Sequence, residues 1–461
     1  MRTMDMANRL SLSLTTLLLA LVFLTLPAIA PARAAVKIQE VTSPGGITAW
    51  LVEDYAVPII AVRFAFSGGS VQDPAGKEGL SNLMTGLFDE GAGDLEADAF
   101  QERLDEVGAE MSFDARRDAV YGSMRMLAEA RDEAFGLLRL AVTAPRFDAG
   151  PIERIRAQIV TGIQRDMRDP NVLGRDEFAR ALYGDHPYAR RSDGTAETLA
   201  AITADDLHAL HSRTFARGNL DIAVVGAIDA ETLKTELDRV FGDLPQEPTL
   251  EPVGKAELHL AQLVRYDYPL PQATLQLVYP GIERDDPGFF AAFLMNHMLG
   301  GGTFSSRLFD EVREKRGLAY GVGSALITSD HADMLMIGTS TRADRAQETL
   351  GVIRDVVSQM AEDGVSEEEL ARAKTYLVGA YAINNLGSSS SVASTLVELQ
   401  KDKRGIDYIE RRTALIEAVT ADEVKAAAAR LLNAEPAVLV IGPAEGEAPA
   451  AEPEPDADSD D

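Results

Sequence analysis

The chain has 461 residues, a formal net charge of −29 at pH 7 and no cysteine. The length predicts two or three domains, and the acidity argues against a nucleic acid partner, because phosphate binding requires clustered Lys and Arg. The absence of cysteine excludes disulfides, thiol catalysis and cysteine-bound zinc.

The first 34 residues have the pattern of a signal peptide. Arg2 and Arg9 give a basic start, an apolar run covers residues 10–26, and Ala-Arg-Ala at residues 32–34 provides a small-x-small cleavage site. The run is short for a transmembrane helix. We expect export to a bacterial periplasm without stable membrane insertion after cleavage, and a membrane anchor only if the segment stays uncleaved.

The region after the leader mixes strand and helix patterns. β-Branched and aromatic residues in "ITAWLVE" and "IIAVRFAFSGG" predict strands, as does the apolar "DIAVVGAI". "ADAFQERLDEVGA" and "RDEAFGLLRLAVTA" have the spacing of amphipathic helices. Strand pairs followed by several helices predict an α+β fold, with a mixed or antiparallel sheet and helices packed on one face.

Four segments of the first half recur in the same order in the second. "ITADDL" from Ile202 matches "VTADEV" from Val419, "IERIRAQIV" matches "EEELARAKTYLV", "VGAEMSF" matches "RGLAYGV", and the glycine of "AVVGAID" matches that of "LVIGPAE". This repetition predicts two homologous domains.

The predicted boundaries follow from composition. Residues 1–34 form the signal peptide, 35–244 the N-terminal domain, 245–255 a proline-containing linker, and 256–443 the C-terminal domain. Residues 444–461 combine Pro, Ala and acidic residues without an aromatic residue, which predicts a disordered tail.

The stretch "GLSNLMTGLFDEGAG", residues 79–93, predicts a helix with an unusual polar face. Its apolar stripe has helical spacing and consists of Leu80, Leu83, Met84, Leu87 and Phe88. Its other face carries only small neutral residues, namely Ser81, Asn82, Thr85 and Gly86. A buried helix usually presents a more reactive polar side than this one.

Two other stretches contain candidate chemistry. His208 and His211 are three residues apart on one predicted helix, but no acid completes an H-x-x-E-H or H-E-x-x-H arrangement, which favours structural imidazoles over metal ligands. Gly300, Gly301 and Gly302 match neither a P-loop nor a dinucleotide fingerprint, and locally they read as a flexible connection between helices.

"SSRLFDEVREKRGLAYGV" resembles the C-terminal-domain signature of the pitrilysin/insulinase-type zinc peptidases, most closely the two-domain bacterial branch related to mitochondrial processing peptidase. Further matches are "FSGGSVQDPAGKEGLSNLM", "LYGDHPYAR" and "ARGNLDIAVVGAID", so the resemblance spans nearly all of the mature chain. It implies two homologous α+β domains that form half of a clamshell.

The resemblance also locates the family's inverted zinc motif, H-x-x-E-H, and finds its chemistry missing. Asn82 and Gly86 stand at the two histidine positions, Thr85 at the catalytic base, and Gly162 at the third, glutamate ligand. None of these residues supplies the needed donor or carboxylate. The chain is therefore expected to hold no metal or other cofactor and to be inactive alone as a peptidase.

A complementary part of the family's site is retained. Arg313 and Tyr320 match an Arg–Tyr pair that faces the zinc across the chamber, where the pair binds the substrate carbonyl and the developing oxyanion. The local sequence fits equally well an Arg at a helix end and a Tyr packed on the core. Gly300–Gly302 would be a shortened version of a glycine-rich loop that handles substrate in the noncatalytic subunit of mitochondrial processing peptidase.

These expectations combine into one hypothesis. The chain is a noncatalytic subunit of a periplasmic, heterodimeric zinc peptidase that acts on peptides or unfolded proteins. A partner with H-x-x-E-H brings zinc and base, and this chain brings Arg313, Tyr320 and half of the chamber. The alternatives are a peptide-binding or scaffold protein with no role in hydrolysis, and a peptidase with a relocated metal site.

Overall fold

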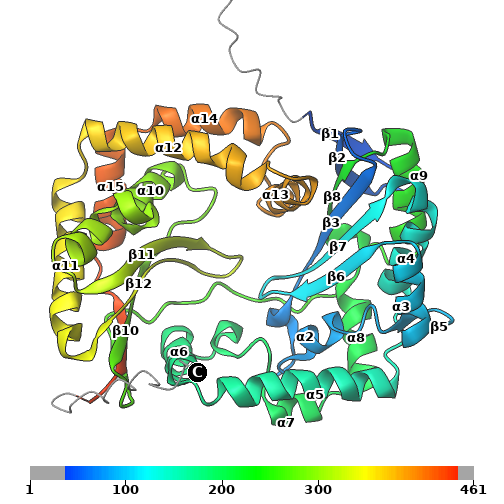
Figure 1. Cartoon of the computed structure of the whole chain (residues 1–461), viewed down its shortest axis with the longest axis horizontal. Coiled ribbons are helices and arrows are strands. Elements are labelled where there is room, and N and C mark those ends of the chain that lie inside the picture. The colour runs from blue at the N-terminus through cyan, green and yellow to red at the C-terminus, as the bar shows by residue number, and fades with distance from the viewer. Residues whose placement is uncertain (1–36, 445–461) are drawn as a thin grey trace, which may run out of the picture. The chain divides into compact units, whose positions relative to one another are not determined.

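The computed structural model describes residues 37–444, which build two β-sheets with their helices (Figure 1). The predicted signal peptide and the acidic tail from residue 445 onward lie outside the described residues. Within the described part, none of the helices combines the length and the apolar character needed to cross a bilayer.

The first half of the chain forms a six-stranded sheet in the order β1-β2-β8-β3-β7-β6. Its strands are β1 (Gln39–Thr42), β2 (Thr48–Glu53), β3 (Ile59–Ser67), β6 (Glu110–Ala115), β7 (Ala119–Leu127) and β8 (Leu220–Gly226). β2 and β8 pair in parallel and the other neighbours pair antiparallel. A separate small ribbon joins β4 (Gly91–Ala92) to β5 (Leu95–Glu96).

Eight helices accompany this sheet within the described residues. They are α2 (Leu80–Thr85), α3 (Ala97–Glu106), α4 (Arg131–Thr143), α5 (Ala149–Asp166), α6 (Pro170–Tyr183), α7 (Ala196–Ala200), α8 (Ala204–Thr214) and α9 (Ala230–Phe241). Short 3₁₀ turns lie at Ser70–Gln72, Ala128–Ala130, Pro187–Ala189 and Arg217–Asn219.

The second half forms a five-stranded sheet in the order β11-β12-β10-β13-β9. Its strands are β9 (Leu263–Asp267), β10 (Gln272–Pro280), β11 (Ala319–Thr328), β12 (Asp333–Arg342) and β13 (Ala437–Gly442). Its helices are α10 (Phe289–Asn296), α11 (Ala346–Asp363), α12 (Glu367–Asn385), α13 (Ser389–Lys401), α14 (Tyr408–Ala418) and α15 (Ala421–Leu432). Two π-helical turns, His297–Gly301 and Phe309–Glu314, and 3₁₀ turns at Thr303–Ser305 and Ala343–Arg345 complete it.

The two sheets have the same topology. The order β2-β8-β3-β7-β6 of the first corresponds strand by strand to β9-β13-β10-β12-β11 of the second, and in each sheet the parallel pair occupies the same place. The predicted α+β class with two homologous halves is therefore confirmed. The exact domain boundaries stay a prediction.

The repeated sequence "TADD/TADE" has a clear structural meaning. Thr203 caps α8, since its side chain accepts from the backbone of Asp206 while the Asp206 carboxylate accepts from the backbone of Thr203. Thr420 and Glu423 form the same reciprocal capping box at the start of α15. Such a box satisfies N–H groups that a helix start otherwise leaves unpaired.

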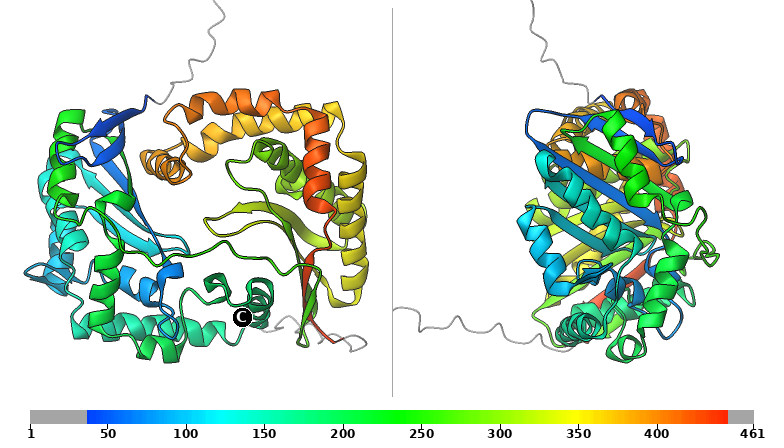
Figure 2. Two further views of the ribbon diagram at one scale, coloured as in Figure 1. Left: turned by 180° about the vertical axis from the view of Figure 1, so that it is seen from behind. Right: turned by 90° about the vertical axis from the view of Figure 1, so that its right-hand side faces the viewer.

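One helix of each half packs against the sheet of the other half. In the first sheet, α4 and α9 cover one face while α13 of the second half contacts β3 and β8 on the other (Figures 1 and 2). Conversely, α6 of the first half contacts β9 and β13. The Gln400 amide on α13 donates to the carbonyl of Ile222 in β8 over 2.9 Å. On α6, Gly174 faces Ile441 so closely that an added Cβ would lie 2.7 Å from its side chain.

The segment between the halves contains no helix or strand from residue 245 to residue 262 (Figure 2). It is held at Glu251, whose backbone carbonyl accepts from the Gln72 amide over 3.0 Å and whose N–H donates back to it over 2.8 Å. This pair of hydrogen bonds fixes the segment against the 3₁₀ turn after β3.

The close packing of α6 against the second sheet predicts opposite effects on stability for two Gly→Ala substitutions in helices. Gly136→Ala on α4 meets no atom within 4 Å and should raise the free energy of unfolding by up to about 1 kcal/mol. Gly174→Ala gains the same increase in helix propensity, but its Cβ overpacks Ile441 at a cost of about 1–3 kcal/mol. The free energy of unfolding of this variant should therefore be lower than that of the parent. Urea unfolding measures both, and equal gains would show that α6 does not pack tightly on β13.

Candidate functional site

Helix α2 carries the stripe that the sequence singled out, but it is shorter than predicted. The spacing predicted a helix through Phe88, and that extension is wrong because the α-helix ends at Thr85 with Gly86 as its C-cap. Leu87 and Phe88 nevertheless stay buried, at 1% and 0% exposure, in the turn that follows. The apolar stripe therefore predicts correctly which residues are buried, but it predicts a helix that is too long.

The polar side of α2 contains an anchor that the sequence did not indicate. Ser81 is fully buried, and its hydroxyl and its N–H both donate to the Asp73 carboxylate, over 2.5 and 3.0 Å. The N–H of Gly79 donates to the same carboxylate. Burial raises the pKa of the Asp73 carboxyl to about 7, although these hydrogen bonds act in the opposite direction. Asp73 thus holds the start of α2 and leaves Ser81 no free hydroxyl.

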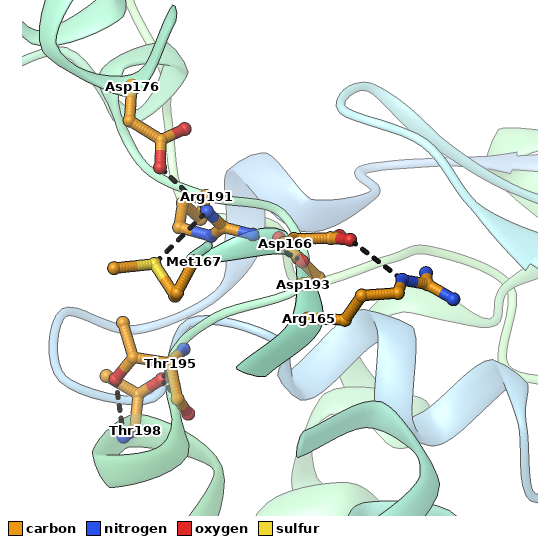
Figure 3. Close-up of polar contacts among 8 residues, drawn as sticks. All are labelled: Arg165, Asp166, Met167, Asp176, Arg191, Asp193, Thr195 and Thr198. Carbon is orange, nitrogen blue, oxygen red and sulfur yellow. Dashed lines mark hydrogen bonds and ion pairs between the residues drawn. The ribbon is translucent and has the colours of Figure 1, made fainter. Parts of the chain in front are cut away.

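A loop after α6 lies beside the residues that precede α2 (Figure 3). The Arg191 guanidinium lies between two carboxylates and donates to Asp176 over 2.7 Å and to Asp193 over 2.9 Å. The Thr198 hydroxyl, at the capping box that opens α7, donates to the carbonyl of Glu78 over 2.8 Å. These contacts hold the residues that lead into α2 and give the helix a fixed position.

The four positions of the family's zinc site lie on two packed helices, α2 and α5. Thr85 is buried, and its hydroxyl donates to the carbonyl of Asn82 over 2.9 Å. An added Cβ at Gly86 would lie 2.9 Å from Ile155 of α5, whereas one at Gly162 would meet no atom within 4 Å. Ile155 therefore fills space beside the second histidine position.

This donor set does not fit zinc, which is bound in proteins by thiolate, imidazole or carboxylate groups. Among residues 37–444, no three or more His, Asp or Glu side chains are grouped so that they could hold a metal ion.

The two histidines of α8 have different environments. His208 is exposed, whereas His211 is buried and its Nε2 lies 2.8 Å from the carbonyl of Val142. Burial lowers the pKa of the His211 imidazole to about 4, so this ring is neutral at physiological pH and donates to Val142. His211 acts as a structural hydrogen-bond donor.

Arg313 and Tyr320 are brought together in the second half. Arg313 lies in the π-helical turn Phe309–Glu314 and Tyr320 lies near the start of β11, with Gly317 at φ 58° between them. The carbon of the Arg313 guanidinium is 4.7 Å from the Tyr320 ring centroid and 4.8 Å from that of Phe309. Two cation–π contacts therefore orient this side chain.

Tyr320 does not pack on the core, since 86% of it is exposed. The alternative of a strand tyrosine packed on the core is therefore wrong, and the described contact of this ring is with the Arg313 guanidinium. Phe304, which sequence reasoning missed, is 76% exposed, and its ring is edge-on to Phe309 at a centroid distance of 5.0 Å. The signal was an aromatic residue two positions after the last glycine, in "GGGTFSSR".

Gly300, Gly301 and Gly302 are explained by close packing. A Cβ on Gly300 would lie 2.6 Å from Ser324 of β11, one on Gly301 would lie 2.8 Å from the Asn296 amide, and one on Gly302 would lie 2.8 Å from the carbonyl of His297. At Gly300 and Gly302 the close atom belongs to the backbone, so glycine is needed there for the turn to fit, whereas at Gly301 it is the end of a side chain that can move.

The comparisons with known proteins agree with this picture. A family model described as "Peptidase M16 inactive domain" matches residues 201–377. The chain is 31% identical to a crystal structure of a peptidase M16 inactive domain from Pseudomonas fluorescens, with a TM-score of 0.83, over 90% of this chain and 99% of that one.

Curated relatives carry names of two kinds. An uncharacterized zinc protease of Streptomyces coelicolor is 28% identical over 88% of this chain and 90% of its own length. A non-peptidase homolog of Helicobacter pylori is 25% identical over 74% of this chain and 79% of its own length.

The contact of Gly86 with Ile155 makes the second histidine position difficult to refill. Gly86→His should lower the free energy of unfolding by about 1–3 kcal/mol, because its Cβ would overlap Ile155. The matched change Asn82→His, at a half-buried position on the same helix, should have less than half of this effect. Urea unfolding compares the two, and equal losses would show that Ile155 is not the obstacle.

The neutral His211 predicts a pH-dependent stability. Its folded pKa of about 4 lies below the reference value of 6.5, so the contribution is complete above pH 6.5 and is lost as the pH falls toward 4. The loss should reach about 2 kcal/mol between pH 6.5 and pH 5. The free energy of unfolding, measured by denaturation at several pH values, should fall less steeply toward acidic pH in His211→Gln than in the parent. His208→Gln is the control and should behave like the parent. A parent slope that survives in His211→Gln would contradict the assignment.

Proposed function

Because this chain belongs to the peptidase M16 family, we propose that it is a noncatalytic subunit of a two-chain zinc peptidase. In this proposal a second M16 chain with an intact H-x-x-E-H motif binds zinc and supplies the base. The present chain supplies Arg313, Tyr320 and part of the wall around a peptide or unfolded protein substrate. The proposed location of this complex is a bacterial periplasm, because the first 34 residues have the pattern of a signal peptide.

The observation that carries the proposal is the contrast between the two halves. The zinc positions on α2 and α5 hold Asn82, Thr85, Gly86 and Gly162, while the other half presents Arg313 stacked between Phe309 and an exposed Tyr320. Loss of one half of the apparatus together with retention of the other is expected of a subunit that completes a partner's site.

The retained pair suits a carbonyl oxygen that gains negative charge. A guanidinium is permanently charged and presents N–H donors in a fixed plane. The Phe309 and Tyr320 rings restrict where this plane can point, which reduces the reorganisation needed when a substrate arrives. The Tyr320 phenol adds a neutral O–H donor on the exposed side of the pair.

The names of similar proteins support a noncatalytic role. The Pseudomonas fluorescens structure is described as an inactive domain and the Helicobacter pylori relative as a non-peptidase homolog. The zinc protease names of other relatives do not fit the donor set of this chain. The competing function is peptide binding or scaffolding without a role in hydrolysis. The two functions differ in whether the peptidase activity of the complex requires this chain.

The proposal predicts activity only in the complex. This chain should be coexpressed with the motif-bearing M16 chain of the same genome, and cleavage of a quenched-fluorescence peptide should be measured for each chain and for both. Neither chain alone should reach the rate of the pair. Arg313→Ala should lower kcat/KM of the complex by about 10²-fold, as loss of an oxyanion donor does, and Tyr320→Phe by a smaller factor.

The control is Arg316→Gln. Arg316 lies three residues from Arg313 but pairs with Glu311 and takes no part in the aromatic stack, so the variant complex should keep parental activity. Full activity of the partner without this chain, or of an Arg313→Ala/Tyr320→Phe complex, would contradict the proposal. Either result, with a stable complex, would favour the scaffold function.

A further inference from the structure

A second candidate binding site lies among four helices of the second half, apart from Arg313 and Tyr320. A cavity of about 710 Å³ is lined by residues of α10, α12, α13 and α14, which contact one another in the fold (Figure 1). Small-molecule and peptide-end sites in proteins commonly have volumes of this order, with apolar walls and a few polar groups.

Aromatic rings form much of the cavity wall. Phe289, Phe290 and Phe293 come from α10, Tyr381 from α12 and Tyr408 from α14. Asn384 and Asn385, near the end of α12, add polar groups to the lining. The site therefore offers flat apolar surfaces for a ring or an aliphatic chain.

Arg412 of α14 gives this cavity a buried positive charge. The residue is only 8% exposed, and its guanidinium donates to the carbonyl of Leu377 over 3.2 Å and lies 4.1 Å from the Tyr381 ring centroid. Burial lowers the pKa of Arg412, but a guanidinium remains protonated in proteins. The charged group that faces it is Arg284, and the phenol groups of Tyr381 and Tyr408 face it as well, with Tyr408 in hydrogen-bond contact.

Arg412 makes no ion pair with any residue of the described range, and the two carboxylates on the cavity wall are bonded to other side chains, one of which, Arg284, also lines the cavity. Asp402 accepts from Arg284 over 3.3 Å. Glu398 accepts from the Tyr121 hydroxyl of the first half over 3.2 Å. A buried cation without a carboxylate partner is costly, so this cavity favours an anion.

The internal repeat makes the position of this cavity informative. α10 and α12 occupy in the second half the places that α2 and α5 occupy in the first, since each pair follows the equivalent strands in the same order. Where the first half has a metal site without donors, the second half has an open aromatic cavity with a cation.

We propose that this cavity binds a carboxylate joined to an aromatic or large apolar group. The carboxylate accepts hydrogen bonds from Arg412 and neutralises its charge, while the apolar group packs against the phenylalanines of α10. Two sources share this chemistry, namely the C-terminal residue of a peptide and a free aromatic acid. The proposal does not depend on the proposed peptidase function.

Calorimetry on the full chain tests the proposal with two matched probe pairs. The first pair is N-acetylphenylalanine and its amide, and the second is a hexapeptide ending in Phe with a free or an amidated C-terminus. In at least one pair the acid should bind at least about tenfold more tightly than the amide, as expected for loss of a charge-assisted hydrogen bond. Tight binding of the hexapeptide acid identifies a peptide terminus, and binding of the small acid alone identifies a free acid.

Three variants locate the site. Arg412→Met keeps the apolar stem and should abolish the preference for the acid, whereas Arg411→Met, at an exposed neighbour paired with Asp407, should keep it. Asn384→Trp narrows the cavity with Arg412 in place and should weaken binding of the acid at least about tenfold. This variant decides the location even if Arg412→Met fails to fold. Equal binding of acid and amide by the parent, or unchanged binding by folded Arg412→Met or Asn384→Trp, would overturn the proposal.

Discussion

The double coverage of both sheets is the constraint on which the rest of the structure depends. β8 and β13 are apolar along almost their whole length, because helices of their own half cover one face and a helix of the other half contacts the sheet as well. A cluster of buried residues joins α6 to the second sheet, including Phe178 and Leu182 with Leu439 and Ile441. Neither half can bury its strands fully without the other.

Packing within the first half explains how α2 is kept in place without the chemistry of the zinc motif. Leu80, Leu83 and Met84 are buried in the core of the first half, and Asp73 fixes the helix start through Ser81. None of these contacts uses Asn82, Gly86 or a metal ion. Packing and catalysis are separable on this helix, which serves as a structural element, and the space beside the second histidine position is filled from α5 by Ile155.

Much of the fold was predictable because it rests on local signals. The repeated segments "ITADDL" and "VTADEV" indicated equivalent places in the two halves, and these are the capping boxes of α8 and α15. The Arg313 guanidinium carbon and the Tyr320 ring centroid, which belong to the pair that the resemblance singled out, are 4.7 Å apart. The end of α2 was not predictable from apolar spacing, since a buried turn continues the same stripe beyond Gly86. The Arg412 cavity was missed entirely, because its walls come from four helices whose proximity only the tertiary fold creates.

The exchanged helices also change the meaning of the segment from residue 245 to residue 262. This segment has no helix or strand, but its backbone is hydrogen-bonded to both halves, for example from Ala256 to the carbonyl of His331 over 2.7 Å and from His259 to that of Leu182 over 2.9 Å. In addition, α6 and α13 tie the halves together through buried side chains. The halves are therefore held together by non-covalent contacts of these helices and of the segment itself, in addition to the covalent link. A chain opened by a protease near residue 255 should remain a single particle, and the two halves should be able to assemble from separate polypeptides.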